Sequence, residues 1–176
     1  MVVRQRTDPD LDRCVAMAVA VHELDGYPLY LPTDLRTFLV SPDAYGAWVV
    51  EDGGEIVGHV ALHRRSLAPV MTLAGQARHQ PVERLGVVAR LLVAPTGRRR
   101  GIGRALLEVA WADAIARGLS PILDVATEFQ GAIRLYEACG WTRAGEVTVG
   151  LADGFSITEH VYLGPHPASP APSAAP

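Results

Sequence analysis

Lysine and asparagine are absent from this 176-residue sequence, and cysteine occurs only twice. Without lysine the chain cannot carry the Gly-Lys-Ser/Thr signature of a P-loop, which excludes that class of nucleotide-binding protein. Cys14 and Cys139 lie far apart, in segments with helical patterns. Such a pair supports neither a disulfide framework nor a zinc site. We therefore expect a reducing, cytoplasmic environment and no metal.

Long hydrophobic runs are missing as well. No window approaches the roughly 18 apolar residues of a membrane span, and residues 1–6 lack the apolar centre of a signal peptide. Positive charge is scarce, because 16 arginines face 19 acidic residues, which gives a net charge of -3. We therefore expect neither a membrane nor a nucleic acid as a partner.

The overall composition is typical of one globular domain. Hydrophobic residues make up 49% of the chain and charged residues 20%, and this length can enclose a sizeable core. After Gly164 the sequence contains only Pro, Ala, Ser and His, which cannot form a core. We predict a single domain over residues 1–163 and a disordered tail over 164–176.

Hydrophobic periodicity and turn signals predict alternating strands and helices. The apolar run 85–93 reads as a central strand buried on both faces. With the helix and strand that follow it, this run forms a crossover that should be right-handed and should join parallel strands. Helices are predicted over 9–24, 34–39, 70–78, 102–117 and 130–138. Strands are predicted over 1–6, 47–51, 55–63, 85–93, 121–126, 142–151 and 156–163, the last two joined by a turn at 152–154.

The most informative segment leads from the central strand into a helix. The first turn of a helix presents unpaired N–H groups and a partial positive charge. Gly101 and Gly103 lack side chains that would keep a phosphate away from those groups, and Arg98 to Arg100 add positive charge. This pattern favours a diphosphate ligand, and the alternative is a tight turn with solvated arginines. A dinucleotide fingerprint does not fit, because Leu106 stands where its third glycine would be.

Two motifs then point to one family. Arg98-x-x-Gly101-x-Gly103, after a strand ending Leu91-Leu92-Val93-x-Pro95, resembles the acetyl-coenzyme A loop of the GNAT acetyltransferase superfamily. The segment 132–141 (AIRLYEACGW) resembles a later helix of the same family. The resemblance extends over residues 1–163. It implies an α/β (α+β) fold whose central mixed, mostly antiparallel sheet splays around the cofactor and is flanked by helices. It also implies an acetyl-CoA-dependent N-acetyltransferase.

The resemblance further implies roles for particular residues. Leu91 would offer its N–H to the thioester carbonyl, and Val93 would bind the pantetheine arm. Tyr136 matches the tyrosine that gives a proton to the departing coenzyme A thiolate, as a phenol shielded from water can do. The cofactor-binding positions carried over by motif are Leu91, Leu92, Val93, Arg98, Arg99, Arg100, Gly101, Ile102, Gly103, Arg104, Gln130 and Ala132.

The sequence departs from the family pattern at two positions. Phe129 stands where relatives often have an asparagine that contacts the pantetheine, and Val87 stands where many have a glutamate base. An ordinary alkylammonium needs a base at neutral pH, because its pKa is about 10.4. The candidates are Glu83, His22, Asp25, His59 and a water molecule held by the backbone.

The acceptor is expected to be a primary amine of a small molecule or a peptide. In the family the loop after the first helix covers the amine side of the cleft, which here implicates His22, Asp25, Tyr27 and Tyr30. The alternative is that the tyrosines only anchor this loop. Two rival functions are a catalytically silent acyl-CoA sensor and an RNA-binding module built on the arginine loop. Homodimers are common in the family, so a second copy of the chain is a further expected partner.

Overall fold

The computed structural model of the chain describes residues 1–29, 34–150, 154 and 156–166. In this part of the chain, seven strands form one sheet in the order β1-β2-β3-β4-β5-β7-β6. The strands are β1 (Val2–Gln5), β2 (Ala44–Asp52), β3 (Glu55–His63), β4 (Leu85–Val93), β5 (Ser120–Ala126), β6 (Thr142–Gly150) and β7 (Ser156–Leu163). The α-helices are α1 (Leu11–Asp25), α2 (Leu35–Leu39), α3 (Ala68–Arg78), α4 (Ile102–Ala116) and α5 (Gln130–Ala138).

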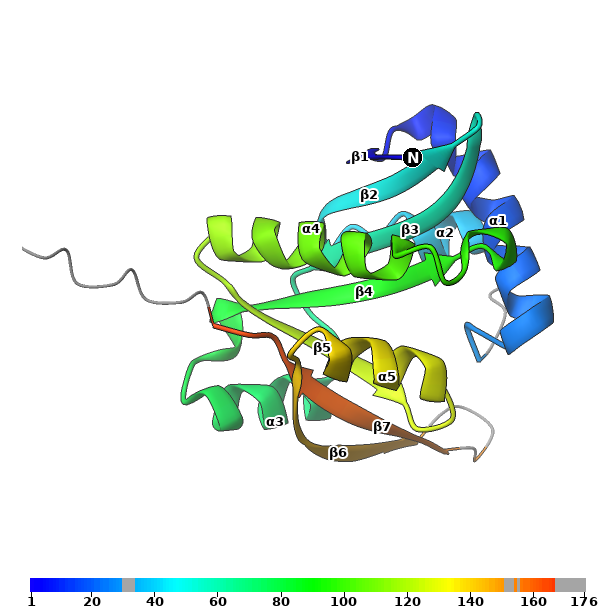
Figure 1. Ribbon diagram of the computed structural model, residues 1–176. Helices are drawn as coiled ribbons and strands as arrows, with labels where there is room; N and C mark the ends of the chain where they lie inside the picture. Colours follow the sequence, from blue (N-terminus) through cyan, green and yellow to red (C-terminus); the bar gives the residue numbers. More distant parts are fainter. Residues whose placement is uncertain (30–33, 151–153, 155, 167–176) are drawn as a thin grey trace, which may run out of the picture.

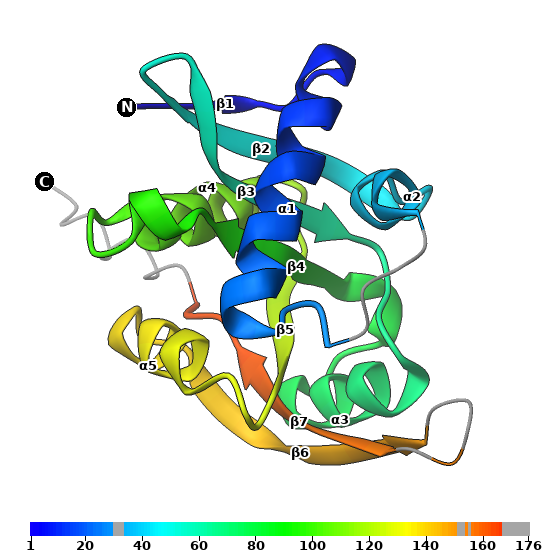
Figure 2. The ribbon, with the colours of Figure 1, turned by 90° about the vertical axis from the view of Figure 1, so that its right-hand side faces the viewer.

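Helices cover both faces of the sheet. Figure 1 and Figure 2 together place α4 and α5 on one face and α2 and α3 on the opposite face, while α1 packs against β3, β4 and α2. The predicted burial of β4 on both faces is confirmed, because Val88 belongs to the main core and Val87 to a second cluster beneath α3. Contact between α4 and β3 is close at Gly58, where a Cβ atom would lie 2.8 Å from side-chain atoms of Ile102 and Leu106.

The sheet is open at its centre. β4 and β5 run parallel but pair at only three positions, Leu85 with Ser120, Gly86 with Pro121 and Val87 with Ile122. Beyond these pairs the two strands diverge (Figure 1), while β5 stays paired with β7 as far as Ala126. The other strand pairs are antiparallel. The mixed, mostly antiparallel and splayed sheet expected from the sequence is therefore confirmed.

A bulge interrupts β4 where it borders the gap. The pairing with β3 shifts between His59–Leu92 and Ala61–Ala89, so one extra residue is accommodated, and Arg90 adopts a left-handed φ of 56°. Nε2 of His59 lies 3.1 Å from Nη1 of Arg6, and Nδ1 lies 3.0 Å from the carbonyl oxygen of Arg90. Because a guanidinium only donates, Nε2 accepts and Nδ1–H donates to Arg90. The imidazole therefore stabilises the bulge, which turns Arg90 out of the regular strand pattern.

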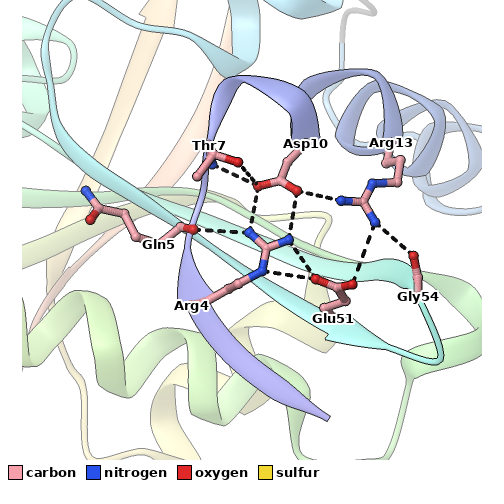
Figure 3. Close-up of polar contacts among 7 residues, drawn as sticks. All are labelled: Arg4, Gln5, Thr7, Asp10, Arg13, Glu51 and Gly54. Atoms are coloured by element: carbon pink, nitrogen blue, oxygen red, sulfur yellow. Dashed lines mark hydrogen bonds and ion pairs between the residues drawn. The ribbon is translucent and has the colours of Figure 1, made fainter.

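An ion-pair network joins the N-terminal elements (Figure 3). Asp10, only 1% exposed, accepts hydrogen bonds from both Nη atoms of Arg4 at 2.7 and 2.8 Å and from Arg13 at 2.6 Å. Arg4 also donates to Glu51 on β2, at 2.7 Å. The Arg4 guanidinium holds the pKa of the Asp10 carboxyl well below its usual range. The network thus ties β1, the start of α1 and β2 together.

The chain after β7 remains attached to the domain. The N–H of Gly164 donates to the carbonyl of Pro121 at 2.8 Å, and Trp111 Nε1 donates to the carbonyl of Pro165 at 2.9 Å. Gly164 and Pro165, the first two residues of the expected tail, therefore contact the domain through their backbone, which needs no large apolar side chain. Most of the predicted tail (167–176) and most of the predicted turn at 152–154 lie outside the described residues. No described helix combines the length and apolarity needed to cross a membrane.

Candidate active site

A cavity of about 830 Å³ lies where β4 and β5 diverge. Its walls come from β4, β5, β7, α5, the loop after α1 and the arginine loop before α4. The backbone of β4 is available on this side. Ala94 donates its N–H to Val57 of β3 at 3.0 Å, and successive N–H groups of a strand point to opposite sides. The N–H groups of Val93 and Leu91 therefore point away from β3, towards the gap.

The cofactor-binding residues predicted on β4 alternate between the cavity and the core. Leu91 and Val93 line the cavity. Leu92 is 1% exposed and belongs to the main core, so its side chain does not line the cavity. Two gap-facing N–H groups on one strand suit an extended amide-containing ligand, which can pair with β4 as a further strand would.

The arginine loop leads into α4 with a run of unpaired donors. Arg99 and Gly101 both have positive φ angles, of 57° and 79°. Within the described chain, the N–H groups of residues 99–104 have no backbone acceptor. Positive φ values bring successive N–H groups to one side, and the start of α4 adds its partial charge. The loop is therefore suited to bind an anion of the size of a diphosphate.

The side chains of this loop have different positions. Arg98 and Arg99 line the cavity, and Arg98 is paired with Asp25 through Nη1 and Oδ1 at 3.0 Å. Arg100 lies outside the cavity lining and pairs with Asp52 at 2.6 Å, while Arg104 donates to the carbonyl of Ala138 at 3.2 Å. Ile102 is buried in the core.

Gly103 has a packing role as well as a place in the loop. A Cβ atom added there would lie 2.9 Å from Cδ2 of Leu135, which is itself a cavity residue on α5. The sequence predicted that a larger residue at position 103 would obstruct phosphate alone. In the structure such a residue also pushes on α5.

Tyr136 lies on the buried face of α5. It is 7% exposed and lines the cavity, with the rings of Trp141 and Tyr162 centred 6.4 and 6.1 Å away. Burial raises the pKa of the phenol well above its ordinary value, so the hydroxyl keeps its proton. Gln130 and Ala132 also line the cavity, and Gln130 donates its side-chain N–H to the carbonyl of Thr127 at 2.9 Å.

Two of the residues predicted to contact the acceptor reach the cavity. Tyr27 lines it, with its ring edge-to-face against Phe129 at 5.3 Å, and burial raises its pKa to about 12. Asp25 lines it too, in the pair with Arg98. His22 is turned elsewhere, with Nδ1 2.9 Å from the carbonyl of Pro28. Tyr30 lies outside the described residues.

The remaining base candidates from the sequence do not line the cavity. Glu83 is exposed in the short turn before β4. His59 is fully buried between Arg6 and Arg90, and burial lowers its pKa to about 4. Val87, at the position of the family glutamate, faces the core beneath α3.

Four charged residues that the motifs did not indicate do line the cavity: Arg90, Asp124, Glu159 and the exposed Glu128. Glu159 on β7 is paired with Ala126 of β5, and its buried Oε2 has no hydrogen-bond partner in the described chain. Burial, assisted by Asp124, raises the pKa of Glu159 to about 7. Asp124 accepts a hydrogen bond from Ser66 Oγ at 2.9 Å, and burial raises its pKa as well.

The sequence does contain a signal for two of these residues, Arg90 and Asp124. Arg90 is the single charged residue in the apolar strand 85–93, and Asp124 is the single charged residue in 120–126. Burying a charge is costly unless it is paired, so a lone charge in a buried strand indicates a functional position. Glu159 lies in a polar strand and has no such signal. No group of three His, Cys, Asp or Glu side chains in the described residues is arranged to hold a metal ion.

Comparison with known proteins supports this architecture. An N-acetyltransferase from Staphylococcus aureus Mu50 superposes with a TM-score of 0.70 at 18% identity, covering 92% of this chain and 96% of that one. The ribosomal-protein-S18-alanine N-acetyltransferase of Escherichia coli gives 0.65 at 20% identity, with 99% and 97% covered. The yncA protein of Salmonella typhimurium, solved with its cofactor acetyl-CoA, gives 0.67 at 19% identity, with 99% of both chains covered. No significant match to a curated protein was found.

The sequence pattern of the Acetyltransferase (GNAT) family matches residues 14–141, which is more than half of the chain. This match begins in α1 and ends just after α5, so it includes the splayed strands, the arginine loop and Tyr136. The chain belongs to the GNAT acetyltransferase family. It is an enzyme of the acetyl-CoA-dependent N-acetyltransferase type.

Proposed function

We propose that this enzyme transfers the acetyl group of acetyl-CoA to a primary amine in the cavity between β4 and β5, with Tyr136 as the general acid. The observation that carries the proposal is that a neutral, buried phenol and the gap-facing N–H groups of Leu91 and Val93 belong to one cavity. The unpaired N–H groups of residues 99–104 lie along the chain just after β4.

The residues present fit acetyl-CoA, which when bound supplies an acetyl thioester. The N–H groups of residues 99–104 would hold the diphosphate, with Arg98 and Arg99 beside them. Val93 would pair with an amide of the pantetheine arm. Leu91 N–H would donate to the thioester carbonyl oxygen, on which negative charge develops as the amine attacks.

Three proton transfers complete the reaction. Glu159 first takes a proton from the bound ammonium group, which frees the lone pair of the nitrogen. The carboxylate of Glu159 suits this role because Glu159 lines the same cavity as Tyr136, and its Oε2 lacks a hydrogen-bond partner in the described chain. The amine nitrogen then forms the new bond to the carbonyl carbon as the carbon–sulfur bond breaks, and Tyr136 gives its proton to the departing thiolate. The second proton of the nitrogen, which the new amide must lose, restores the Tyr136 hydroxyl, and Glu159 returns its own proton to solvent.

The acceptor is a free amine, and two classes are candidates. One is a small molecule, for which a cavity of about 830 Å³ with a largely apolar lining is suited. The other is a protein N-terminus, which the similarity to the ribosomal-protein-S18-alanine N-acetyltransferase of Escherichia coli brings into consideration. A silent acyl-CoA sensor would use neither an acid nor a base, whereas this cavity contains a candidate for each.

Thiol release from acetyl-CoA with a panel of amines tests the proposal. We expect turnover in the parent enzyme and a loss of about 10²-fold or more in Tyr136→Phe, with coenzyme A binding by calorimetry unchanged. Tyr45→Phe, on β2 and outside the cavity lining, is the matched control. Binding of acetyl-CoA without turnover of any amine would instead support the sensor.

A further inference from the structure

Two residues of opposite charge that line the cavity, Arg90 and Glu159, each carry a buried side-chain atom without a partner in the described chain. In the described chain, neither Nη1 of Arg90 nor Oε2 of Glu159 makes a hydrogen bond. No ion pair within 4.0 Å joins Arg90 to a carboxylate in that part of the molecule. The guanidinium of Arg90 instead lies over the ring of Phe38, 4.5 Å from its centroid. A half-buried guanidinium with an unpaired buried Nη1 is destabilising, so its presence in a cavity indicates a ligand group of opposite charge.

The position of Arg90 is built into the fold at some cost. The residue has a φ of 56°, which is unfavourable for a side chain of this size, and it stands at the bulge of β4. His59 bridges Arg6 and the Arg90 carbonyl and thereby stabilises the bulge. A strained backbone conformation that neighbouring contacts hold in place is typical of binding sites. Here it brings the cation of Arg90 into the mostly apolar strand β4.

Negative charge comes from the opposite side of the gap. Asp124 on β5 adds to burial in raising the pKa of Glu159 on β7. Both carboxyls likewise add to burial in raising the pKa of Tyr27. Arg90 also influences the pKa of Tyr27, by lowering it, and all four residues line the cavity. Among the strands that line the cavity, β4 therefore contributes one cation, and β5 and β7 contribute two carboxyls, with the aromatic ring of Tyr27 in the same lining.

We propose that the acceptor is a small amino acid, whose carboxylate is bound by Arg90 and whose ammonium group is received by Glu159 and Asp124. This inference rests on the proposed acetyl transfer and names the substrate class of the same site. A guanidinium matches a carboxylate in shape and charge, and a charge-assisted pair is among the strongest hydrogen-bonded contacts. The rings of Tyr27 and Phe38 provide an apolar surface for the side chain of the acceptor.

Other amines satisfy only part of this arrangement. A polyamine has no anion to offer Arg90 and would leave it unpaired. A protein N-terminus presents a neutral peptide carbonyl where an amino acid has its carboxylate, so a buried guanidinium would be only partly compensated. A zwitterion of amino-acid size compensates the charge of Arg90 and the charges of Glu159 and Asp124 at once.

Matched acceptors test the proposal directly. Thiol release is measured with L-amino acids, with the corresponding carboxamides, and with spermidine and a short peptide with a free N-terminus. We expect kcat/KM to be roughly 10- to 100-fold higher for the amino acid than for its amide, as charged hydrogen bonds imply. In Arg90→Gln the ratio should fall to near one, with the KM for acetyl-CoA unchanged. Arg84→Gln, an exposed residue just before the same strand, is the control.

The outcomes separate the two proposals. Equal use of acid and amide by the parent enzyme, or a preference for spermidine or the peptide, would overturn the amino-acid inference and leave acetyl transfer standing. If no amine releases thiol, the proposed function fails, and calorimetric binding of amino acid against amide judges the inference on its own. No preference for the acid in that measurement would overturn it. These comparisons use the parent enzyme, so they hold even if Arg90→Gln does not fold.

Discussion

Nδ1 of His59 donates to the carbonyl oxygen of Arg90 over 3.0 Å, across the bulge in β4. The other ring nitrogen accepts from Arg6, so a fully buried, neutral imidazole connects the residue just after β1 with the cavity wall. The sequence made His59 a candidate base. Its position instead makes it a positioning residue that acts through Arg90.

Replacing His59 with Leu should therefore weaken acceptor selection. The change removes one of the two acceptors of Arg6 Nη1, which keeps the Leu39 carbonyl, and leaves the Arg90 carbonyl without its imidazole donor. We expect this to cost about 2–4 kcal/mol of stability. We also expect the preference for an amino acid over its amide to fall, with the KM for acetyl-CoA unchanged. Leu62→Ala, on the same strand, destabilises by a comparable amount through a cavity and should keep the preference. Equal loss of preference in both variants would show that destabilisation alone explains the effect.

The pH dependence of catalysis should follow Glu159. The base must be a carboxylate, and its pKa of about 7 predicts that kcat/KM rises as the pH increases through that value. Glu159→Gln should lose this limb and about 10²-fold of the rate. Glu55→Gln, exposed on β3, serves as the control. A rising limb near pH 7 that survives in Glu159→Gln would assign it to another group.

The same residue should make the enzyme less stable at high pH. The folded pKa of Glu159 lies above its ordinary value of 4.5, so the folded state binds this proton more tightly than the unfolded state. Stability from this group is present below pH 4.5 and is lost as the pH rises through about 7. Thermal melts should therefore show Glu159→Gln more stable than the parent at pH 8, with a smaller difference at pH 5. A variant that melts lower at pH 8 would contradict this assignment.

The pair between Asp25 and Arg98 links the end of α1 to the cofactor loop. Asp25 competes with a diphosphate for Arg98 and adds a negative charge beside the loop. Asp25→Ala should lower the KM for acetyl-CoA, by up to about fivefold for a partly exposed pair. The KM for the amine should stay close to that of the parent. An increase in the amine constant alone would place Asp25 in the acceptor site, as the sequence predicted. Asp12→Ala, exposed on the same helix, is the control.

Asp10 should be a major contributor to stability at neutral pH. Asp10→Asn removes the charge that compensates Arg4 and Arg13, and we expect a loss of roughly 2–4 kcal/mol in chemical denaturation at pH 7. The folded pKa lies below the ordinary value of 3.8, so this contribution is present above that value and is lost as the pH falls below it. The difference between parent and variant should therefore shrink below pH 4. A difference that is constant with pH would mean that shape, and not charge, is responsible.

Local signals predicted most of the fold. Gly118 and Gly140 follow α4 and α5 with positive φ angles, and Pro95 bounds β4, so the bounds of these elements could be set within a residue or two. The bulge at Arg90 could not be predicted, because it depends on the register of β3 against β4. Glu159 enters the cavity only because β7 pairs with β5 and β4 turns away. For Gly103 the motif indicated phosphate access, whereas the contact with Leu135 depends on the packing of α5 on α4.

The three residue pairs that join β4 to β5 leave the sheet as two blocks with a short seam. A ligand that hydrogen-bonds to β4 inside the gap would contact both blocks and hold them together. Amide hydrogens at Leu91 and Val93 would then exchange with solvent more slowly in the complex than in the free enzyme. The two blocks would also unfold more cooperatively while the cofactor is bound, so the stability of the whole domain would depend on cofactor binding.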